Sequence, residues 1–344
     1  MKVLVDIGHP AHVHFYRHVC QRLIEAGHQV LVTSREKDCA VELLDAIGAD
    51  HCCLSRQNDG RLHGMGWEYL SRLRALVSFV RAEKPDLLTG VGGIFAAHAG
   101  VLCRRPSVIF YDTEHATLQN SLTYPAATRL YVPDCYTAWT PSRRTVRYRG
   151  YHELAYLRPE YFEPSHEIAQ SRCGLAAEGD TFLVRVVSWQ ANHDVGEAGW
   201  SESTLRTVVA LLERKGRVII STESPLPSDL ADRVYQGRPE HLHHLLAFCR
   251  ACIGESATLA SESAVLGVPA LYAAQVSRGY LDDIERRYGL VRVVGSTDPA
   301  AVSRGIEKVL ALVPKEAQLR RLRLLEDTCD VTDTIYRSLT AFAS

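Results

Sequence analysis

Short apolar runs alternate with amphipathic helical stretches in the first half of the chain, and this alternation constrains the fold more than any other feature. The run Val3–Ile7 ends in a Gly turn, and a helical stretch over residues 15–26 follows it. Alternation at this spacing is typical of a parallel sheet covered by helices on both faces. The further strands that we expect before the middle of the chain are 28–33, 86–91, 107–111 and 129–132, and the further helices are 41–47 and 67–84.

The pattern lapses between residues 140 and 165, where three prolines interrupt aromatic and charged residues. We therefore predict two Rossmann-like, doubly wound parallel-sheet domains, 1–163 and 164–344, that face a cleft. A last helical stretch, 319–342 with a break near 328–330, is long enough to cross back to the first domain. In the second domain we expect strands at 181–187, 217–221, 251–254 and 269–272, and helices at 204–215, 242–250, 256–266 and 299–312.

The charge balance argues against one class of partner. The 344 residues include 39 Lys and Arg and 40 Asp and Glu, which gives a formal net charge of −1. A chain without a basic excess lacks the electrostatic footprint of a nucleic-acid-binding protein. We find no apolar run long enough to span a bilayer and no signal peptide before the first strand. The expectation is therefore a cytoplasmic protein with reduced thiols and no transmembrane segment.

A histidine-rich loop follows the first strand and leads into a helix. His9 and His12 lie at this helix N-terminus, which offers free backbone N–H groups. We predict that His12 reaches into the cleft as a general base, and that His9 belongs to an acceptor or phosphate loop. A metal site built from His12, His14 and His18 is an alternative, although no carboxylate or Cys stands at a familiar spacing. In another alternative, His14 and His18 lie partly buried on the faces of the helix.

Glycines follow the strand at 86–91. The sequence Thr89-Gly90-Val91-Gly92-Gly93 leads into a helix, and glycines in such a turn let the backbone approach a phosphate closely. We assign Gly92 and Gly93 to the acceptor or phosphate loop. The alternative is a tight strand-to-helix turn whose small residues pack on the sheet.

Carboxylates follow the strand at 107–111, at the same edge of the sheet as the first two loops. Asp112 and Glu114 are separated by one threonine, and a histidine follows them. We assign Asp112 and Glu114 to acid–base or acceptor-orienting roles. The alternative is that one of these carboxylates caps the following helix.

In the second domain a strand ends at Gly254, and small hydroxyl residues begin a helix. Such a helix N-terminus can bind phosphate through its free N–H groups and its dipole. Glu262 falls about two turns into this helix, where a carboxylate can accept hydrogen bonds from both ribose hydroxyls of a nucleotide. The nucleotide- and phosphate-binding residues that we predict are Gly254, Ser256, Thr258, Ser261 and Glu262, with Ser188 after the first strand of the domain.

These residues carry a resemblance to a known superfamily. The turn at Gly254, Glu262 and Leu266-Gly267-Val268-Pro269 resemble the nucleotide-sugar segment of the GT-B enzymes. These include the transferase that adds N-acetylglucosamine to lipid I and the UDP-N-acetylglucosamine 2-epimerases. The resemblance implies that Glu262 binds the nucleotide ribose. His12 matches a loop histidine of the lipid I transferase, and Gly90–Gly93 matches its second Gly-rich loop.

The resemblance to these enzymes extends to other segments of the chain, but some segments differ from theirs. Asp112 and Glu114 lie near the acidic acceptor-side segment of the lipid I transferase. Nearly the whole chain is similar to an uncharacterised family that is labelled a domain of unknown function and grouped with these enzymes. The transferase has a Gly-Ser-Gln-Gly turn where this chain has Ser188-Trp189-Gln190. The segment Pro125–Arg129 lacks the second carboxylate that an epimerase would be expected to have.

The resemblance implies a metal-independent, nucleotide-sugar-dependent glycosyltransferase of GT-B type that acts in glycan or glycolipid biosynthesis. UDP is the expected donor nucleotide, no cofactor is expected, and the acceptor is a sugar, a lipid-linked molecule or a small molecule. One alternative is an epimerase or hydrolase like the UDP-N-acetylglucosamine 2-epimerases, and another is a nucleotide-sugar-binding protein without turnover. Two segments stay outside this assignment. His241, His243 and His244 suggest an exposed helix start, and residues 150–157 line the acceptor side or form a packed linker.

Overall fold

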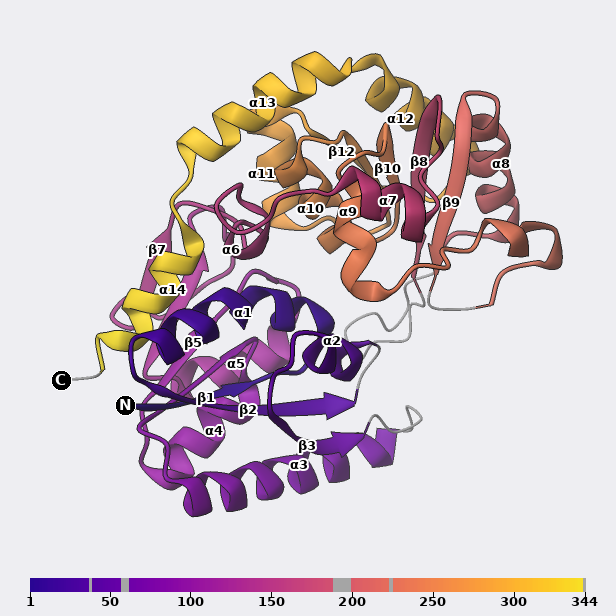
Figure 1. The fold of residues 1–344 in the computed structure, drawn as a ribbon. Coiled ribbons are helices and arrows are strands. Elements are labelled where there is room, and N and C mark those ends of the chain that lie inside the picture. Colours follow the sequence, from indigo (N-terminus) through magenta and orange to yellow (C-terminus); the bar gives the residue numbers. More distant parts are fainter. Residues whose placement is uncertain (37–38, 57–61, 188–198, 223–224, 343–344) are drawn as a thin grey trace. The chain divides into compact units, whose positions relative to one another are not determined.

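The computed structural model of the chain describes residues 1–36, 39–56, 62–187, 199–222 and 225–342 (Figure 1). The chain forms two compact units. The first consists of Met1–Tyr156 together with Cys329–Ser344, and the second is Leu157–Thr328. The chain therefore passes from one unit to the other twice.

The expected division is a single boundary at 163/164. The structure instead has one boundary after Tyr156 and a second after Thr328, because the C-terminal residues belong to the first unit. The reason is the packing of helix α14 (Val331–Thr340). The Thr332 hydroxyl donates a hydrogen bond to the Ala155 carbonyl at 2.6 Å, and the Arg22 guanidinium lies 2.9 Å from the Asp333 carboxylate. The expected helix break near 328–330 is confirmed, and it separates α14 from α13 (Pro314–Asp327).

The first unit contains a seven-stranded parallel sheet with the order β3-β2-β1-β4-β5-β6-β7. The central strands are short apolar runs, and they are buried because helices cover both faces of a parallel sheet of this kind. The strands are β1 (Lys2–Asp6), β2 (Gln29–Glu36), β3 (His51–Arg56), β4 (Leu87–Val91), β5 (Ser107–Phe110), β6 (Arg129–Pro133) and β7 (Thr145–Tyr148).

The other helices of the first unit are α1 (Pro10–Glu25), α2 (Ala40–Ala46), α3 (Leu62–Glu83), α4 (Ile94–Cys103), α5 (Thr117–Ala126) and α6 (Leu154–Leu157), of which α6 ends at the boundary. One face of the sheet packs on α3, α4 and α5 through side chains that include Leu4, Leu88 and Ile109. On the other face, the Phe15 ring of α1 lies 5.3 Å from the Phe110 ring. Helix α14 packs on α1, as Figure 1 shows. The loops that follow the strands therefore lead into helices on both faces.

The second unit contains a five-stranded parallel sheet with the order β12-β11-β10-β8-β9. Its strands are β8 (Asp180–Val186), β9 (Gly216–Thr222), β10 (Ala251–Gly254), β11 (Ala270–Ala273) and β12 (Val291–Val294). Its α-helices besides α13 are α7 (His166–Cys173), α8 (Glu202–Glu213), α9 (Leu242–Leu246), α10 (Ala257–Leu266), α11 (Gly279–Tyr288) and α12 (Pro299–Ala311), and its 3₁₀ helices are η1 (Ser228–Arg233) and η2 (Pro239–His241).

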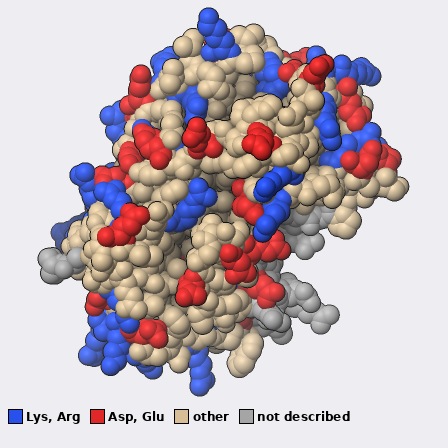
Figure 2. All heavy atoms as spheres, viewed as in Figure 1, with Lys and Arg blue, Asp and Glu red and all other residues tan. Residues whose placement is uncertain are grey.

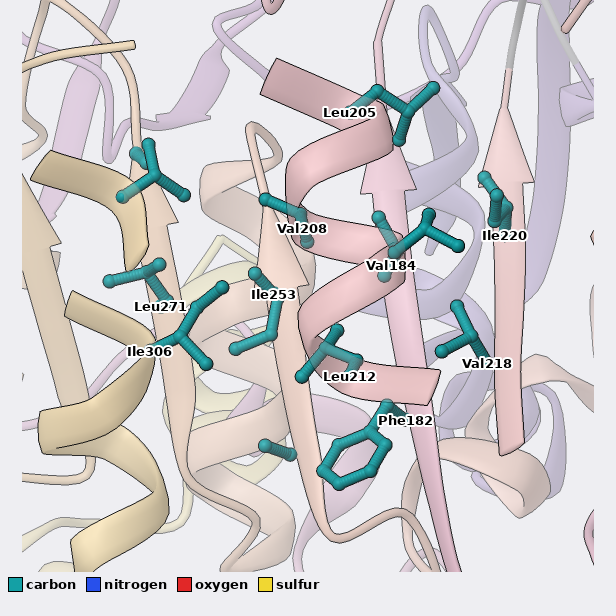
Figure 3. Packing of buried hydrophobic residues seen from close by; sticks show 14 of the residues in the cluster. Phe182, Val184, Leu205, Val208, Leu212, Val218, Ile220, Ile253, Leu271 and Ile306 are labelled. Carbon is teal, nitrogen blue, oxygen red and sulfur yellow. The ribbon is translucent and has the colours of Figure 1, made fainter. Parts of the chain in front are cut away.

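One face of this second sheet forms a hydrophobic core with α8 and α12 (Figure 3). Phe182 and Val184 of β8 face this core, where they meet residues such as Leu212 of α8. Because side chains alternate along a strand, Leu183 and Arg185 point to the opposite face. Helix α10 packs against β10 and β11, and its own residues from Leu259 to Leu266 are all buried.

The predicted fold class is confirmed, and the differences concern the edges of the sheets. The three strands that sequence analysis missed, β3, β7 and β12, each lie at the edge of a sheet. On the molecular face shown in Figure 2, basic and acidic side chains are interspersed. Within the described ranges, no helix combines the length and apolar character needed to cross a membrane.

Candidate functional site

The histidine loop of the first unit is fixed by two hydrogen bonds from the backbone. The backbone N–H of Ala11 donates to Nδ1 of His9 at 3.2 Å, so His9 caps the N-terminus of α1. The backbone N–H of Gly8 donates to Nδ1 of His12 at 3.3 Å. The two imidazole rings lie 5.8 Å apart. Because His9 acts as the cap, α1 begins at Pro10, five residues earlier than the apolar pattern indicates.

Asp112 follows β5 and is held by two side-chain hydrogen bonds. Its Oδ2 atom lies 3.1 Å from Nδ1 of His152, and its Oδ1 atom accepts from the Thr113 hydroxyl at 2.9 Å. Burial alone would raise the pKa of this carboxyl, but the charge and hydrogen bond of His152, together with Thr113 and the more distant His12, hold the pKa at about 2. Asp112 is therefore an anion at neutral pH.

Glu114 contacts Thr137, and its acid–base or acceptor-orienting role stays a prediction. Its Oε1 atom lies 3.2 Å from the backbone N of Thr137, which donates to it. The Thr137 hydroxyl lies 3.4 Å from the same oxygen. The carboxylate thus ties the loop after β5 to the segment after β6. The alternative of a carboxylate cap on α5 is wrong, because the N-cap residue is Ala116 and no side chain caps this helix.

His152 is the partner that sequence analysis did not assign to Asp112. It is buried, and its ring centroid lies 4.5 Å from that of Phe15. Burial opposes the imidazolium charge, but Asp112 and then Glu153 outweigh this effect and raise the pKa of His152 above its ordinary value. The Nε2 atom is enclosed and makes no hydrogen bond with any described residue. Tyr151, Glu153 and Tyr156 are buried as well, so this segment is packed.

The glycines before α4 form a tight turn. Gly92 has a φ of +57°, and a Cβ atom there would lie 2.9 Å from Nε2 of Gln119. A Cβ atom on Gly93 would lie 3.1 Å from Cδ1 of Ile109. Packing and backbone conformation therefore account for both glycines. A role of Gly92 and Gly93 in binding an acceptor or phosphate stays a prediction.

The histidines of α1 do not gather around a common point. The His14 ring stacks on Tyr156 with centroids 5.2 Å apart. Nε2 of His18 accepts from Nε of Arg17 at 3.0 Å, and burial, then the Arg17 charge, lower the pKa of His18 to about 4. The part of the chain that the structure describes contains no group of three His, Cys, Asp or Glu side chains able to hold a metal ion. The alternative of a metal site at His12, His14 and His18 gains no support.

In the second unit, the turn from β10 to α10 is built against β8. A Cβ atom on Gly254 would lie 2.2 Å from the Arg185 carbonyl oxygen, so only glycine allows the two strands to approach. The backbone N–H of Glu255 donates to the same carbonyl at 3.0 Å. The Ser256 hydroxyl oxygen accepts from the Leu259 N–H at 3.2 Å and caps α10. Helix α10 therefore begins at the carboxyl end of β10, as predicted.

Ser261 lies in the next turn of α10 and is completely buried. Its hydroxyl donates back to the Thr258 carbonyl at 2.9 Å. This geometry gives Ser261 a hydrogen bond inside the helix, and its contact with a nucleotide stays a prediction. Ser188 lies outside the described residues.

Glu262 is fixed on α10 by a histidine of α9. Its Oε1 atom lies 3.0 Å from Nε2 of His243, and the two side chains are only 6% and 8% exposed. The expectation that His243 belongs to an exposed helix start is wrong, because the Phe162 ring and α10 enclose it. Glu262 therefore lies on α10 with one carboxylate oxygen engaged by His243, and its contact with a nucleotide ribose stays a prediction.

Arg185 is a candidate that sequence analysis missed. It lies near the carboxyl end of β8, and its Nη1 atom donates to the Ser221 hydroxyl at 2.8 Å. Burial raises the pKa of the Cys252 thiol, Glu262 raises it further and Arg185 lowers it, so both charges act on the same thiol. Arg185 points to the sheet face opposite the core with α8 and α12, and α10, which carries Glu262, packs against β10 and β11. The one available signal was an arginine inside the apolar run Phe182–Val187.

Cys249 and Cys252 form a Cys-x-x-Cys spacing. Burial raises the pKa of Cys249, with a smaller contribution from Cys252, and burial also dominates the shift of Cys252. Both thiols are therefore protonated at neutral pH and are poor nucleophiles.

Comparisons with known proteins agree with this architecture. The family described as "Protein of unknown function (DUF354)" matches residues 1–339. No curated protein matches the chain. Among solved structures, the UDP-GlcNAc 2-epimerase from Methanocaldococcus jannaschii, in complex with UDP-GlcNAc and UDP, is similar with a TM-score of 0.69 at 12% identity. That match covers 99% of this chain and 100% of the epimerase chain.

Two glycosyltransferases are similar over their full lengths. The spinosyn forosaminyltransferase SpnP has a TM-score of 0.65 at 16% identity, and the match covers 100% of both chains. The calicheamicin glycosyltransferase CalG4 has a TM-score of 0.61 at 15% identity, and the match covers 99% of this chain and 98% of the other. At these identities the likeness shows the fold, which GT-B glycosyltransferases and UDP-GlcNAc 2-epimerases share.

Proposed function

The chain belongs to the DUF354 family, and from this premise and the site in its second unit we propose that it is a nucleotide-sugar-dependent glycosyltransferase of GT-B type. The second unit binds the donor, with UDP as the preferred nucleotide. The first unit binds the acceptor, which is a sugar, a lipid-linked molecule or a small molecule.

The observation that carries the proposal is the position of Glu262 on α10. The carboxylate is held by His243 about one and a half turns beyond the Ser256 cap. A nucleotide whose phosphates meet the helix N-terminus would place its ribose at this depth. Charge-assisted hydrogen bonds from the ribose hydroxyls to Glu262 would then orient the donor.

The same face of the second unit supplies positive potential for the leaving diphosphate. The first turn of α10 contains no acidic residue, and the positive end of the helix dipole lies there. Arg185 adds a guanidinium, which is suited to phosphate oxygens. These groups would stabilise the charge that develops as the bond to the sugar breaks, without a need for a metal ion.

The alternative of an epimerase is favoured by one specific observation. The first unit places the half-buried Asp112 beside the buried His152, and the buried Glu153 also acts on this imidazole. An epimerase moves protons on and off carbon and needs several acid–base groups. These three side chains therefore support the epimerase alternative more strongly than the sequence motifs do.

One experiment separates these functions. The full chain is incubated with a panel of UDP-, GDP-, CMP- and dTDP-sugars, with and without candidate acceptors, and the sugar signals are followed by NMR. A new glycosidic linkage that appears only with an acceptor supports the transferase. A new epimer, or hydrolysis without an acceptor, supports the alternative. Binding without any reaction indicates a nucleotide-sugar-binding protein, and no binding to any sugar nucleotide contradicts the proposal.

A further inference from the structure

The hydrogen bonds of the first unit fix the protonated ring nitrogen of His12. Nδ1 of His12 faces the backbone N–H of Gly8, which can only donate. Nδ1 therefore uses its lone pair as the acceptor, and the proton of a neutral imidazole sits on Nε2. In that tautomer, Nε2 donates a hydrogen bond and has no lone pair with which to take a proton.

His152 is held in the opposite tautomer. Its Nδ1 faces Oδ2 of Asp112, and an ionised carboxylate can only accept. Nδ1 of His152 therefore carries the proton, and the lone pair of the neutral ring is on Nε2. This is the arrangement in which an aspartate orients a histidine base. The Nε2 atom is enclosed and has no hydrogen-bond partner among the described residues, which is the state expected of a nitrogen that awaits a ligand or water.

We propose that His152, oriented by Asp112, is the proton acceptor of the first unit, and that His12 is a hydrogen-bond donor through Nε2. This inference rests on the proposed transfer reaction. The acceptor O–H bond breaks, and the proton goes to Nε2 of His152 directly or through one water. The electron pair left on the oxygen forms the bond to the anomeric carbon. The nucleotide diphosphate leaves with the electron pair of its own bond to that carbon.

The groups around His152 make it a stronger base than a solvated imidazole. Asp112 and Glu153 supply negative charge, and together they outweigh the effect of burial. From α1, the Phe15 ring covers His152, and His12 acts electrostatically on Asp112. The buried Tyr148 hydroxyl of β7 also interacts with Asp112 and Glu153. The acidic limb of the pH–rate profile is therefore expected to have its midpoint above the ordinary imidazole pKa of about 6.5.

A direct test is the tautomer of each ring in the full chain. The protein is labelled with ¹⁵N-histidine, and long-range ¹H–¹⁵N correlations are recorded as the pH is raised until both rings are neutral, because the pKa of His152 lies above its ordinary value. Single His→Gln variants assign the signals. We expect the proton on Nδ1 of His152 and on Nε2 of His12. A proton on Nε2 of His152 in the wild type would overturn the inference, whatever the activity of the protein.

The variant Asp112→Asn tests whether Asp112 sets this tautomer. An asparagine can present its amide N–H to Nδ1, so the proton of His152 should move to Nε2. The matched control is Asp45→Asn, because Asp45 forms an exposed pair with His51 at 3.2 Å and should leave the His152 signals unchanged. An unchanged His152 tautomer in folded Asp112→Asn would contradict the inference.

Turnover distinguishes the two histidines. Gln in place of His12 retains an N–H donor near the position of Nε2, so His12→Gln should lose about tenfold or less in kcat. His152→Gln removes the proton acceptor and should lose about 10²–10⁴-fold, with nucleotide-sugar affinity retained. The reverse order of the two losses would overturn the assignment. If no nucleotide sugar binds, the proposed function is contradicted. The NMR measurement of the two tautomers still tests whether Asp112 orients His152.

Discussion

Nε2 of His243 lies 3.0 Å from Oε1 of Glu262, and this buried pair joins α9 to α10 in the second unit. The pair gives Glu262 a fixed orientation before any ligand arrives. A preoriented carboxylate loses little conformational entropy on binding. The same contact means that a substitution of Glu262 affects both the packing of the unit and the proposed ribose contact, so binding and stability need to be measured together.

For Glu262→Ala, we expect the affinity for UDP to fall by about 1.5–3 kcal/mol, because a charge-assisted contact to the ribose is lost. Isothermal titration calorimetry measures this. Glu262→Gln is the control, since it keeps an acceptor for His243 and should lose less stability than Glu262→Ala. If Glu262→Ala remains folded and binds UDP as tightly as the wild type, Glu262 has only a structural role.

Gly254→Ala should destabilise the second unit strongly. A Cβ atom would lie 2.2 Å from the Arg185 carbonyl oxygen, so β8 and β10 would have to separate, at a cost of at least about 1–3 kcal/mol. The control is Gly295→Ala, where a Cβ atom meets nothing within 4 Å. Urea unfolding followed by circular dichroism compares the two variants. Equal stability of both would show that the strands can adjust.

Arg72 neutralises a buried carboxylate beneath the histidine loop. Its Nη2 atom lies 2.8 Å from Oδ1 of Asp6, and the side chains are 1% and 5% exposed. Arg72→Met should reduce the free energy of unfolding by about 3–5 kcal/mol, because the charge of Asp6 stays buried without its partner. Arg206→Met, which breaks exposed pairs with Asp229 and Glu202, should cost far less, because solvent screens these charges. A similar small effect at both positions would argue against a buried charge on Asp6.

The pair Asp112–His152 should stabilise the fold within a limited pH range. The pKa of Asp112 is lowered to about 2, so its contribution is present above about pH 4 and is lost as the pH falls through 2. The pKa of His152 is raised, so its contribution is present below about pH 6.5 and is lost as the pH rises through the raised value. The wild type should exceed Asp112→Asn by about 2 kcal/mol between these limits. Urea unfolding from about pH 3 to pH 9 measures the difference, and a constant difference would contradict the ion pair.

The sequence predicts the interior of both sheets better than their edges. Strands such as β1 and β10 are apolar runs, because helices or neighbouring strands surround them on every side. The edge strand β3, His-Cys-Cys-Leu-Ser-Arg, faces solvent along one side and has no such run. The edge strand β7 is equally polar and contains only four residues. A partly exposed edge strand therefore lacks the continuous apolar run from which sequence analysis predicts a strand.

The candidate site shows the same division between local and long-range information. The helix that carries Glu262 could be predicted, because its glycine, hydroxyl cap and carboxylate lie within ten residues of one another in the sequence. The partners of Asp112 and Glu262 could not, since they are distant in sequence and are brought into contact only by tertiary packing. Neither His152 nor His243 stands in a pattern that distinguishes a buried, paired imidazole from a surface one. The orientation and protonation of these imidazole rings depend on contacts with residues that are distant in the sequence.

The return of α14 to the first unit has a consequence for how the protein is synthesised. On the ribosome, the strands of the first sheet emerge before the second unit, but the helix that packs on α1 emerges only after it. Between them the whole second unit emerges, with its two ends close together, since Arg158 donates to the carbonyls of Leu325 and Thr328 at 3.5 and 3.4 Å. The inserted unit can thus complete its fold before α14 is synthesised, whereas the first unit must wait for α14. Nascent chains stalled before residue 329 would therefore expose the surface of α1 on which α14 packs.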